Sequence, residues 1–256
     1  MLPPGRERRE SAVNNTYHER RNEPIGSKQS LGIIAHEIKS PISAVIQLLQ
    51  SAEILLQDSD QAEALALVQR AIKRARNALQ ISRGLLDYLK VDTVQKPADE
   101  HALIPADNIQ QLIEAQIQMA FNRDVRLEHE LRDTHVRLGI NQFEWDIVVS
   151  NLISNAIRYS KRDAGTQTVW IRTFIRENSF VFEVRDQGIG MSDDEKNRIF
   201  DGFYRSMKAK EQTTSGSGFG LAMVKKIVED TGGSIECVSA PGLGTTFTVF
   251  FPIRGA

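Results

Sequence analysis

The sequence has very little cysteine: Cys237 is the single one among 256 residues. One thiol forms neither an intramolecular disulfide nor an all-cysteine metal site, and this usage is typical of the reducing cytoplasm. Long apolar runs are also missing, since no window approaches the roughly 18 to 20 consecutive apolar residues of a membrane helix. The N-terminus lacks the apolar core of a signal peptide. We therefore expect a cytoplasmic protein without a membrane segment in this chain.

A dominant charge of one sign is absent as well. The 32 Lys and Arg residues against 33 Asp and Glu residues leave a formal net charge of -1. This balance argues against nucleic acid as the main partner, because nucleic-acid-binding domains are usually strongly basic. The 41% hydrophobic and 25% charged content is that of an ordinary globular chain and excludes a collagen-like or wholly disordered one. The length suits one large domain or two smaller ones.

The N-terminal third of the chain predicts a tail followed by a helical hairpin. Residues 1–27 mix both charges, hold three prolines and carry few large aliphatic side chains, which indicates a flexible polar tail. Two apolar rows then step by alternating four and three residues, the pattern of helices in a coiled-coil-like bundle. The first row is Leu31, Ala35, Ile38, Ile42, Val45, Leu49, Ala52 and Leu56; the second is Leu65, Val68, Ile72, Ala75, Leu79, Ser82, Leu86 and Leu89. A hairpin of this kind usually dimerises into a four-helix bundle.

After Lys96-Pro97 the periodicity changes to that of a mixed domain. We expect helices over residues 107–121 and 143–159 and a third helix that opens at residues 215–221. We expect strands over residues 125–131, 136–140, 168–175, 179–186, 234–239 and 245–251. The whole chain is thus predicted to be α+β: a helical hairpin, then an α/β sandwich with a mixed, mostly antiparallel sheet.

His36 in the first predicted helix is a candidate for nucleophilic chemistry. It lies off the apolar row and shares a helix face with Ser40, while Pro41 favours a bend just beyond it. A neutral imidazole can accept a phosphoryl group, and Glu37 could take or orient its ring proton. The alternative is an ordinary surface histidine before a kink.

The helix over residues 143–159 carries a polar stripe. Asn151, Asn155 and Tyr159 follow at four-residue steps with Arg158 beside them. Amide oxygens suit Mg²⁺, which keeps several waters and shares ligands with substrate phosphates. The alternative is a solvated helix face with incidental amides.

Two glycine-containing segments are candidates for ligand contact. Residues 186–190, Asp-Gln-Gly-Ile-Gly, follow a predicted strand, so that the Asp can accept a hydrogen bond from an exocyclic amine in a tight turn. Residues 216–221, Gly-Ser-Gly-Phe-Gly-Leu, open a helix whose N-H groups favour phosphate. Residues 201–215 between them have the length and composition of a mobile lid. Taken singly, the two segments also read as a plain turn and a flexible linker.

The order of these elements is more specific than any one of them. Residues 28–254 closely resemble the catalytic core of sensor histidine kinases of two-component systems, through the histidine box, the Asn stripe, Asp-x-Gly-x-Gly, Phe200 with Phe203, Gly-x-Gly-x-Gly-Leu and residues 242–247. The resemblance implies a dimerisation and histidine phosphotransfer hairpin over residues 28–95. It further implies an ATP-binding domain over residues 96–256, of the GHKL or Bergerat type shared with gyrase, heat-shock chaperone and mismatch-repair ATPases.

The resemblance also assigns roles to single residues. It implies that His36 is the phosphoacceptor, that Glu37 is its acid/base partner, and that Ser40 stands where relatives able to dephosphorylate their partner typically carry Thr or Asn. It makes Asn155 the magnesium ligand, with Asn151 beside it. The remaining ATP contacts that it implies are Arg158 at the triphosphate, Tyr159 at the ribose or base, Asp186 at the adenine amine, and Gly188, Gly190, Phe203, Gly216, Gly218, Phe219, Gly220, Leu221 and Thr246 around the pocket.

The implied activity is autophosphorylation of His36 by ATP and Mg²⁺ in a homodimer, followed by transfer to an Asp of a response regulator. One alternative is a catalytically degenerate dimeric scaffold or phosphotransfer protein. A second is a chaperone- or repair-type ATPase, which the heptad hairpin and the absence of a further large domain disfavour.

Overall fold

The computed structural model describes residues 28–57, 60–93, 102–104, 106–161, 165–202, 204–212 and 218–254. Contacts divide the chain into unit 1, Met1–Ile81, and unit 2, Ser82–Ala256. The tail predicted over residues 1–27 lies outside the described residues. Because the division falls at residue 81, the long second helix contributes to both units.

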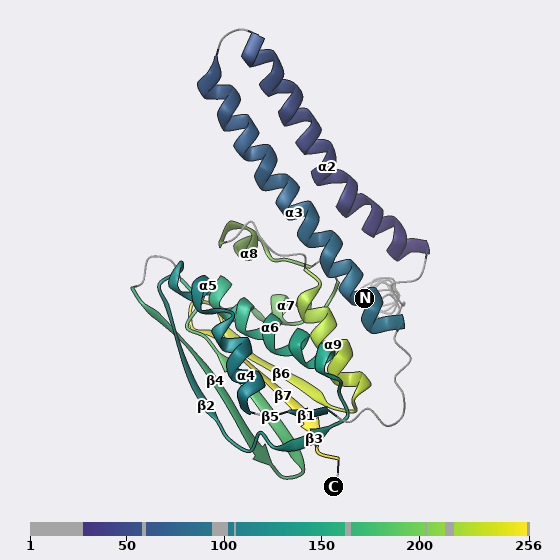
Figure 1. The fold of residues 1–256 in the computed structure, drawn as a ribbon, viewed down its shortest axis with the longest axis vertical. Coiled ribbons are helices and arrows are strands. Elements are labelled where there is room, and N and C mark those ends of the chain that lie inside the picture. The colour runs from purple at the N-terminus through teal and green to yellow at the C-terminus, as the bar shows by residue number, and fades with distance from the viewer. Residues whose placement is uncertain are drawn as a thin grey trace, which may run out of the picture. The chain divides into compact units, whose positions relative to one another are not determined.

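Unit 1 is a helical hairpin, which confirms the prediction. Helix α2 (Lys28–Gln57) runs on through Pro41, and helix α3 (Gln61–Thr93) runs back beside it (Figure 1). The Asp60 carboxylate accepts a hydrogen bond of 3.1 Å from the Glu63 N-H. This is the N-cap that starts α3, because a side-chain oxygen there satisfies one of the free donors of the first turn.

Small side chains line the seam between the two helices. Ala52, Ala64, Ala71 and Ala78 are each at most 7% exposed. The larger aliphatic side chains of the predicted rows instead remain 45–58% exposed, and they are Ile42, Leu49, Leu56, Leu65, Ile72, Leu79 and Leu86. Only Ala52 of these alanines belongs to a predicted row, because Ala64, Ala71 and Ala78 each lie one residue before a predicted position of the second row. The prediction of the seam within α3 is therefore wrong by one residue, and the large aliphatic side chains of the predicted rows form a second, outward aliphatic row.

The main sheet of unit 2 has five strands, and its only parallel pair among the described residues is β2 with β4. Its order is β2 (Val125–Leu131), β4 (Gln167–Arg176), β5 (Ser179–Arg185), β7 (Gly244–Pro252) and β6 (Ser234–Ala240). This confirms the mixed, mostly antiparallel sheet. The β4–β5 hairpin turns at Glu177 and Asn178.

Four helices pack on one face of this sheet (Figure 1): α4 (Ala106–Glu114), α5 (Ile117–Phe121), α6 (Gln142–Tyr159) and α9 (Gly220–Asp230). Trp145 of α6 is fully buried and meets Phe180, Phe182 and Phe251 edge-on, with ring centroids 5.7 to 5.9 Å apart. An Asn141–Glu144 capping box starts α6. Edge-on aromatic pairs add about 0.5–1.5 kcal/mol beyond burial, so this cluster fixes α6 on the sheet.

Two element predictions need correction. The helix expected over residues 107–121 is two helices, because the Gln116 N-H bonds to the Ile113 carbonyl at 2.9 Å and tightens the end of α4. The strand expected over residues 136–140 ends earlier, as β3 (Val136–Leu138). It pairs with β1 (Ala102–Ile104) in a separate two-stranded sheet. Three residues are too few for a periodicity signal, so the sequence did not predict β1.

Candidate functional site

One cavity in unit 2 collects side chains from five separate stretches of the chain. It lies between the C-terminal end of α6, the loop after β5, the segment from Met191 to Ala209, the start of α9 and the start of β7. Five residues proposed from the sequence line it: Asn155, Tyr159, Asp186, Gly190 and Leu221. The fold therefore brings together residues that lie up to 66 positions apart along the chain.

Asp186 is the buried acid of this cavity, with 6% of its surface exposed. Its Oδ1 accepts hydrogen bonds from the Gly188 N-H at 2.7 Å and the Thr245 N-H at 3.1 Å. Burial raises the pKa of this carboxyl from 3.8 to about 6, and the two N-H donors oppose that rise. Within the part of the chain that the structure describes, Oδ2 has no hydrogen-bond partner, so it is available to a donor in the cavity.

The loop that carries Asp186 approaches other backbone so closely that it needs glycine. The Ile189 N-H donates to the Tyr159 carbonyl at 3.1 Å, and a Cβ on Gly188 would lie less than 3.0 Å from that same oxygen. Gly190 has φ +60°, and a Cβ there would collide with the Ala240 carbonyl. The two glycines thus hold the loop against α6 and β6, although Gly188 itself does not line the cavity.

The polar end of α6 contributes Asn155 and Tyr159 to the lining, whereas Arg158 does not line the cavity. The Arg158 Nη1 donates to Asn155 Oδ1 at 3.3 Å, and the Arg123 Nη1 donates to the Arg158 carbonyl at 2.6 Å. Burial lowers the pKa of the Arg158 guanidinium; the ionisable Tyr159 side chain opposes this shift and Arg205 adds to it. A desolvated cation with a second cation nearby favours an anionic ligand.

Several other residues proposed from the sequence support the site without lining it. The Asn151 Nδ2 donates to the Ile147 carbonyl at 2.7 Å, and its Oδ1 lies against Gly220 at the start of α9. Phe219 is fully buried. Gly218 and Gly220 also lie outside the cavity lining.

The threonine of β7 that lines the cavity is Thr245. Thr246, which was proposed from the sequence, does not line it. Successive side chains of a strand point to opposite faces, so a shift of one residue decides which threonine faces the ligand. Phe203 and Gly216 lie outside the described residues, so their proposed contacts stay predictions. The backbones of His36 and Glu37 belong to α2, but their side chains lie outside the described part, and Ser40 is exposed.

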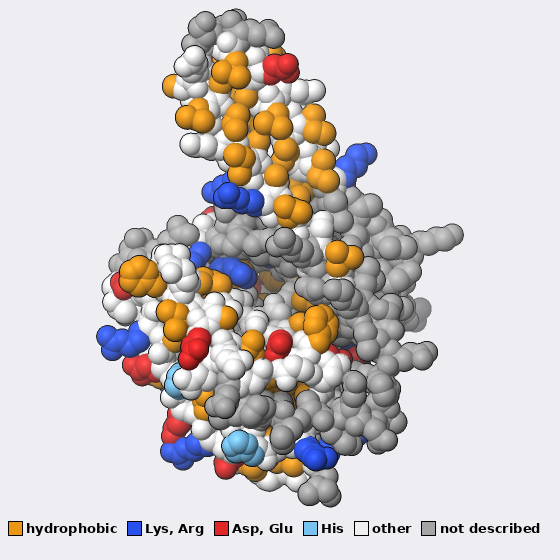
Figure 2. Space-filling view, viewed as in Figure 1, with side chains coloured by type: hydrophobic (Ala, Val, Ile, Leu, Met, Phe, Trp, Pro, Cys, Tyr) orange, Lys and Arg blue, Asp and Glu red, His pale blue; other side chains and the backbone are white. Residues whose placement is uncertain are grey.

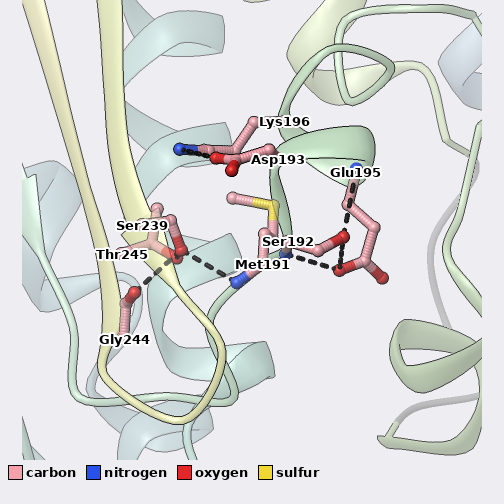
Figure 3. Close-up of polar contacts among 8 residues, drawn as sticks. All are labelled: Met191, Ser192, Asp193, Glu195, Lys196, Ser239, Gly244 and Thr245. Carbon is pink, nitrogen blue, oxygen red and sulfur yellow. Dashed lines mark hydrogen bonds and ion pairs between the residues drawn. The ribbon is translucent and has the colours of Figure 1, made fainter.

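Eleven lining residues were not among the ATP contacts proposed from the sequence, and those with polar side chains are Glu195, Tyr204, Arg205, Ser206 and Thr245. For Glu195 the sequence did contain a local signal, because Ser192 and Glu195 have the spacing of a capping box at the start of a helix. Glu195 accepts from the Ser192 N-H at 2.8 Å and caps α7 (Asp193–Lys196), as Figure 3 shows. This bond is the main cause of a lowered Glu195 pKa.

The segment expected to form a lid contains a short helix, α8 (Met207–Gln212). Ser206 starts it by accepting from the Ala209 N-H at 3.2 Å, and Ala209 lines the cavity. At its other end the Gln212 Nε2 donates to the Ser160 carbonyl at 2.6 Å. The described part of the segment is therefore bonded to the end of α6.

The part of the chain that lines this cavity also matches a known family model. Residues 141–255 match the family described as "Histidine kinase-, DNA gyrase B-, and HSP90-like ATPase". That range holds every cavity-lining residue, from Asn155 to Phe247.

Relatives narrow the class further. The chain is 28% identical over 220 residues to the sensor-like histidine kinase SenX3 of Mycobacterium tuberculosis, covering 86% of this chain and 52% of SenX3. It is 28% identical over 222 residues to the sensor histidine kinase WalK of Bacillus subtilis, covering 86% of this chain and 36% of WalK. The chain thus spans about half or less of the length of these curated relatives.

Solved structures agree in fold. The Acinetobacter baumannii histidine kinase AdeS superposes with a TM-score of 0.63 at 19% identity, over 86% of this chain and 98% of AdeS. Histidine kinase ThkA, solved in complex with response regulator protein TrrA, gives 0.65 at 18% identity, over 97% of this chain and 65% of ThkA. Sequence and fold together support a sensor histidine kinase. Among the described residues, no helix combines the length and apolarity that crossing a bilayer requires.

Proposed function

We propose that the chain is an ATP-dependent protein histidine kinase that phosphorylates its own His36 and passes the phosphoryl group to an Asp of a response regulator. The observation that carries the proposal is a cavity that combines two kinds of polar group. A buried carboxylate, Asp186, lines it together with Asn155, and the half-buried guanidinium of Arg158 is bonded to that Asn155. The carboxylate suits an adenine amine, and the guanidinium suits phosphates.

The proposed nucleotide contacts follow from donor and acceptor chemistry. Asp186 Oδ2 accepts a hydrogen bond from the exocyclic amine of adenine, while Ile189 and Phe247 supply apolar walls to the flat base. Arg158 and Arg205 offset the charge of the triphosphate. Tyr159 lines the cavity four residues after Asn155 on α6 and is the proposed contact of the ribose.

The proposed magnesium ligand is Asn155. Within the described ranges no group of three or more His, Cys, Asp and Glu side chains is placed to hold a metal ion. A single amide oxygen nonetheless fits Mg²⁺, which takes most of its ligands from water and substrate phosphates. When bound, the ion would neutralise phosphate charge. Arg158 keeps the Asn155 oxygen oriented through the 3.3 Å bond.

The proposed reaction is an in-line displacement. A ring nitrogen of His36 forms the N–P bond to the γ-phosphate as the bond from phosphorus to the bridging oxygen breaks and ADP leaves. The second ring nitrogen then loses its proton to Glu37, which returns the imidazole to neutrality. Positioning and charge neutralisation supply most of the catalysis.

Two partners belong to the proposal. A response regulator receives the phosphoryl group; the solved ThkA complex with TrrA supports this partner by analogy of fold. A second copy of the chain covers the outward aliphatic row of α2 and α3. Whether Ser40 supports dephosphorylation of the regulator can be measured with the same pair of proteins.

The test is incubation of the purified chain with Mg²⁺ and γ-labelled ATP. We expect an acid-labile, base-stable label, the stability pattern of phosphohistidine, that the His36→Gln variant does not acquire. His129→Gln is the matched control, because His129 is an exposed histidine of β2 and does not belong to the helical hairpin.

The outcomes separate the alternatives. Equal labelling of His36→Gln and the wild type would reject His36 as the phosphoacceptor. Tight ATP binding without any label would favour the dimeric scaffold. A chain that binds no ATP would contradict the assignment of the cavity.

A further inference from the structure

Ser239 on β6 does not line the cavity, but it is hydrogen-bonded to three other residues, of which Met191 and Thr245 do line it. Its Oγ accepts from the Met191 N-H at 2.9 Å and donates to the Gly244 carbonyl at 2.8 Å. The Thr245 hydroxyl lies 2.9 Å away. Since the single Ser239 proton goes to Gly244, the Thr245 hydroxyl is the donor in that third bond. The three bonds use the whole capacity of one hydroxyl group.

These hydrogen bonds connect three segments of the chain: the loop after β5, the edge strand β6 and the start of β7. Figure 3 shows Ser239 between Met191 on one side and Gly244 and Thr245 on the other. Met191 and Thr245 both line the cavity. A movement of Ser239 would therefore displace two parts of the cavity wall together.

The connection continues to Asp186. The Thr245 N-H donates to Asp186 Oδ1 at 3.1 Å, and the Asp186 N-H donates to the Thr245 carbonyl at 2.8 Å. The Thr245 backbone thus fixes which carboxylate oxygen faces the protein, and Ser239 holds the Thr245 side chain. Lys161 adds a further bond to the same hairpin, since its Nζ donates to the Gly242 carbonyl at 2.7 Å.

We propose that Ser239 is a positioning residue for base specificity: through Thr245 it holds the Asp186 carboxylate in the orientation that accepts an adenine amine and rejects a guanine carbonyl. This inference rests on the proposed nucleotide function of the cavity. Guanine presents a carbonyl oxygen where adenine presents an amine, so only ATP gains from an oriented carboxylate.

The experiment compares Mg-ATP and Mg-GTP binding to the full chain by calorimetry. Ser239→Ala loses all three bonds, but only the one to the Thr245 hydroxyl leads to Asp186. We therefore expect ATP affinity to fall about 5-fold, the effect of one neutral hydrogen bond, while GTP affinity changes little. The ATP/GTP selectivity then falls by nearly the same factor. Ser239→Thr keeps the hydroxyl and restores the selectivity. Ser234→Ala is the control on the same strand, because Ser234 is exposed.

A purely structural role would lower both affinities or the unfolding temperature without changing the selectivity. If Ser239→Ala does not fold, Thr245→Val is the second variant. It removes the Thr245 hydroxyl and with it the bond to Ser239, and it is expected to lower the ATP/GTP selectivity as well. Unchanged selectivity in a folded variant overturns the role of Ser239 alone. A wild-type chain that binds both nucleotides equally overturns the adenine site itself, and the role of Ser239 with it.

Discussion

Asp186 shows how one buried group links pH to ligand binding. Its pKa is raised to about 6 by burial, so the carboxylate that accepts a hydrogen bond is present above that pH and is lost below it. We predict that ATP affinity falls as the pH decreases from 7 to 5, measured by titration calorimetry.

In Asp186→Asn the amide oxygen keeps the Gly188 and Thr245 donors, so the NH₂ group faces the base. Affinity at pH 8 should fall about 10- to 100-fold, because two donors then oppose each other.

The stability of the same variant provides the control. Because the pKa is 3.8 in the unfolded chain and about 6 in the folded chain, ionisation of Asp186 lowers stability as the pH rises from 3.8 to 6, and the full cost is present above pH 6. Asp186→Asn is therefore expected to be at least as stable as the wild type at pH 8, and this advantage should disappear below pH 3.8, where the carboxyl becomes neutral in both states. Loss of ATP binding together with a lower unfolding temperature at pH 8 would contradict this account.

Single residues were predictable where a local pattern carries the chemistry. Asp186 with Gly190 follows a strand directly, and Asn155 with Tyr159 repeats at helical spacing, so both pairs could be placed from the sequence. Thr245 could not be chosen over Thr246, because strand alternation gives two faces without saying which one meets the ligand. Tyr204, Arg205 and Ser206 reach the cavity only through tertiary folding of the segment before α8.

At the scale of elements, we expect α8 to affect nucleotide release, because the residue before it and Ala209 within it line the cavity. It has six residues, and its bond from Gln212 Nε2 to the Ser160 carbonyl holds it against the end of α6. We predict that Gln212→Ala raises the dissociation rate of a fluorescent ATP analogue about 3- to 10-fold, because net hydrogen bonds contribute about 0.5–1.5 kcal/mol. Stopped-flow displacement by unlabelled ATP measures this rate.

Glu211→Ala is the matched control on the same helix. Glu211 is exposed and lies outside the cavity lining, so its removal should leave the dissociation rate unchanged. Equal acceleration in both variants would mean that α8 is weakened by any substitution. No acceleration in either would mean that the bond at Ser160 does not limit release.

The long helices and strands were easier to predict than the breaks between them and the very short strands. Helix α6 and the strands β2, β4, β5, β6 and β7 begin and end within one or two residues of the expected ranges, because each keeps one clear periodicity. The break between α4 and α5 depends on a single tightened turn at Gln116. Strand β1 forms only because β3 is available as its partner. Both features arise from contacts that no local pattern records.

At the scale of the whole molecule, the outward aliphatic row is the proposed dimer interface. The row comprises Ile42, Leu49 and Leu56 on α2 and Leu65, Ile72, Leu79 and Leu86 on α3, all at seven-residue steps within each helix. Figure 2 shows apolar side chains along the visible face of the helical hairpin. Seven-residue spacing is that of a coiled-coil seam, and the seam within one chain is already filled by alanines. The row therefore fits a second copy of the same hairpin.

We predict that Ile72→Glu converts a dimer to a monomer, measured by light scattering at micromolar concentration. Burying each such aliphatic side chain contributes about 1.5–3 kcal/mol, and an uncompensated carboxylate in its place opposes association further. Arg74→Glu is the control, since Arg74 is also exposed on α3 but two positions away, on a different helix face. If His36 labelling requires the four-helix bundle, Ile72→Glu loses the label while retaining ATP binding in unit 2. A monomeric wild type, or a dimeric Ile72→Glu chain, would show that the aliphatic row does not form the interface.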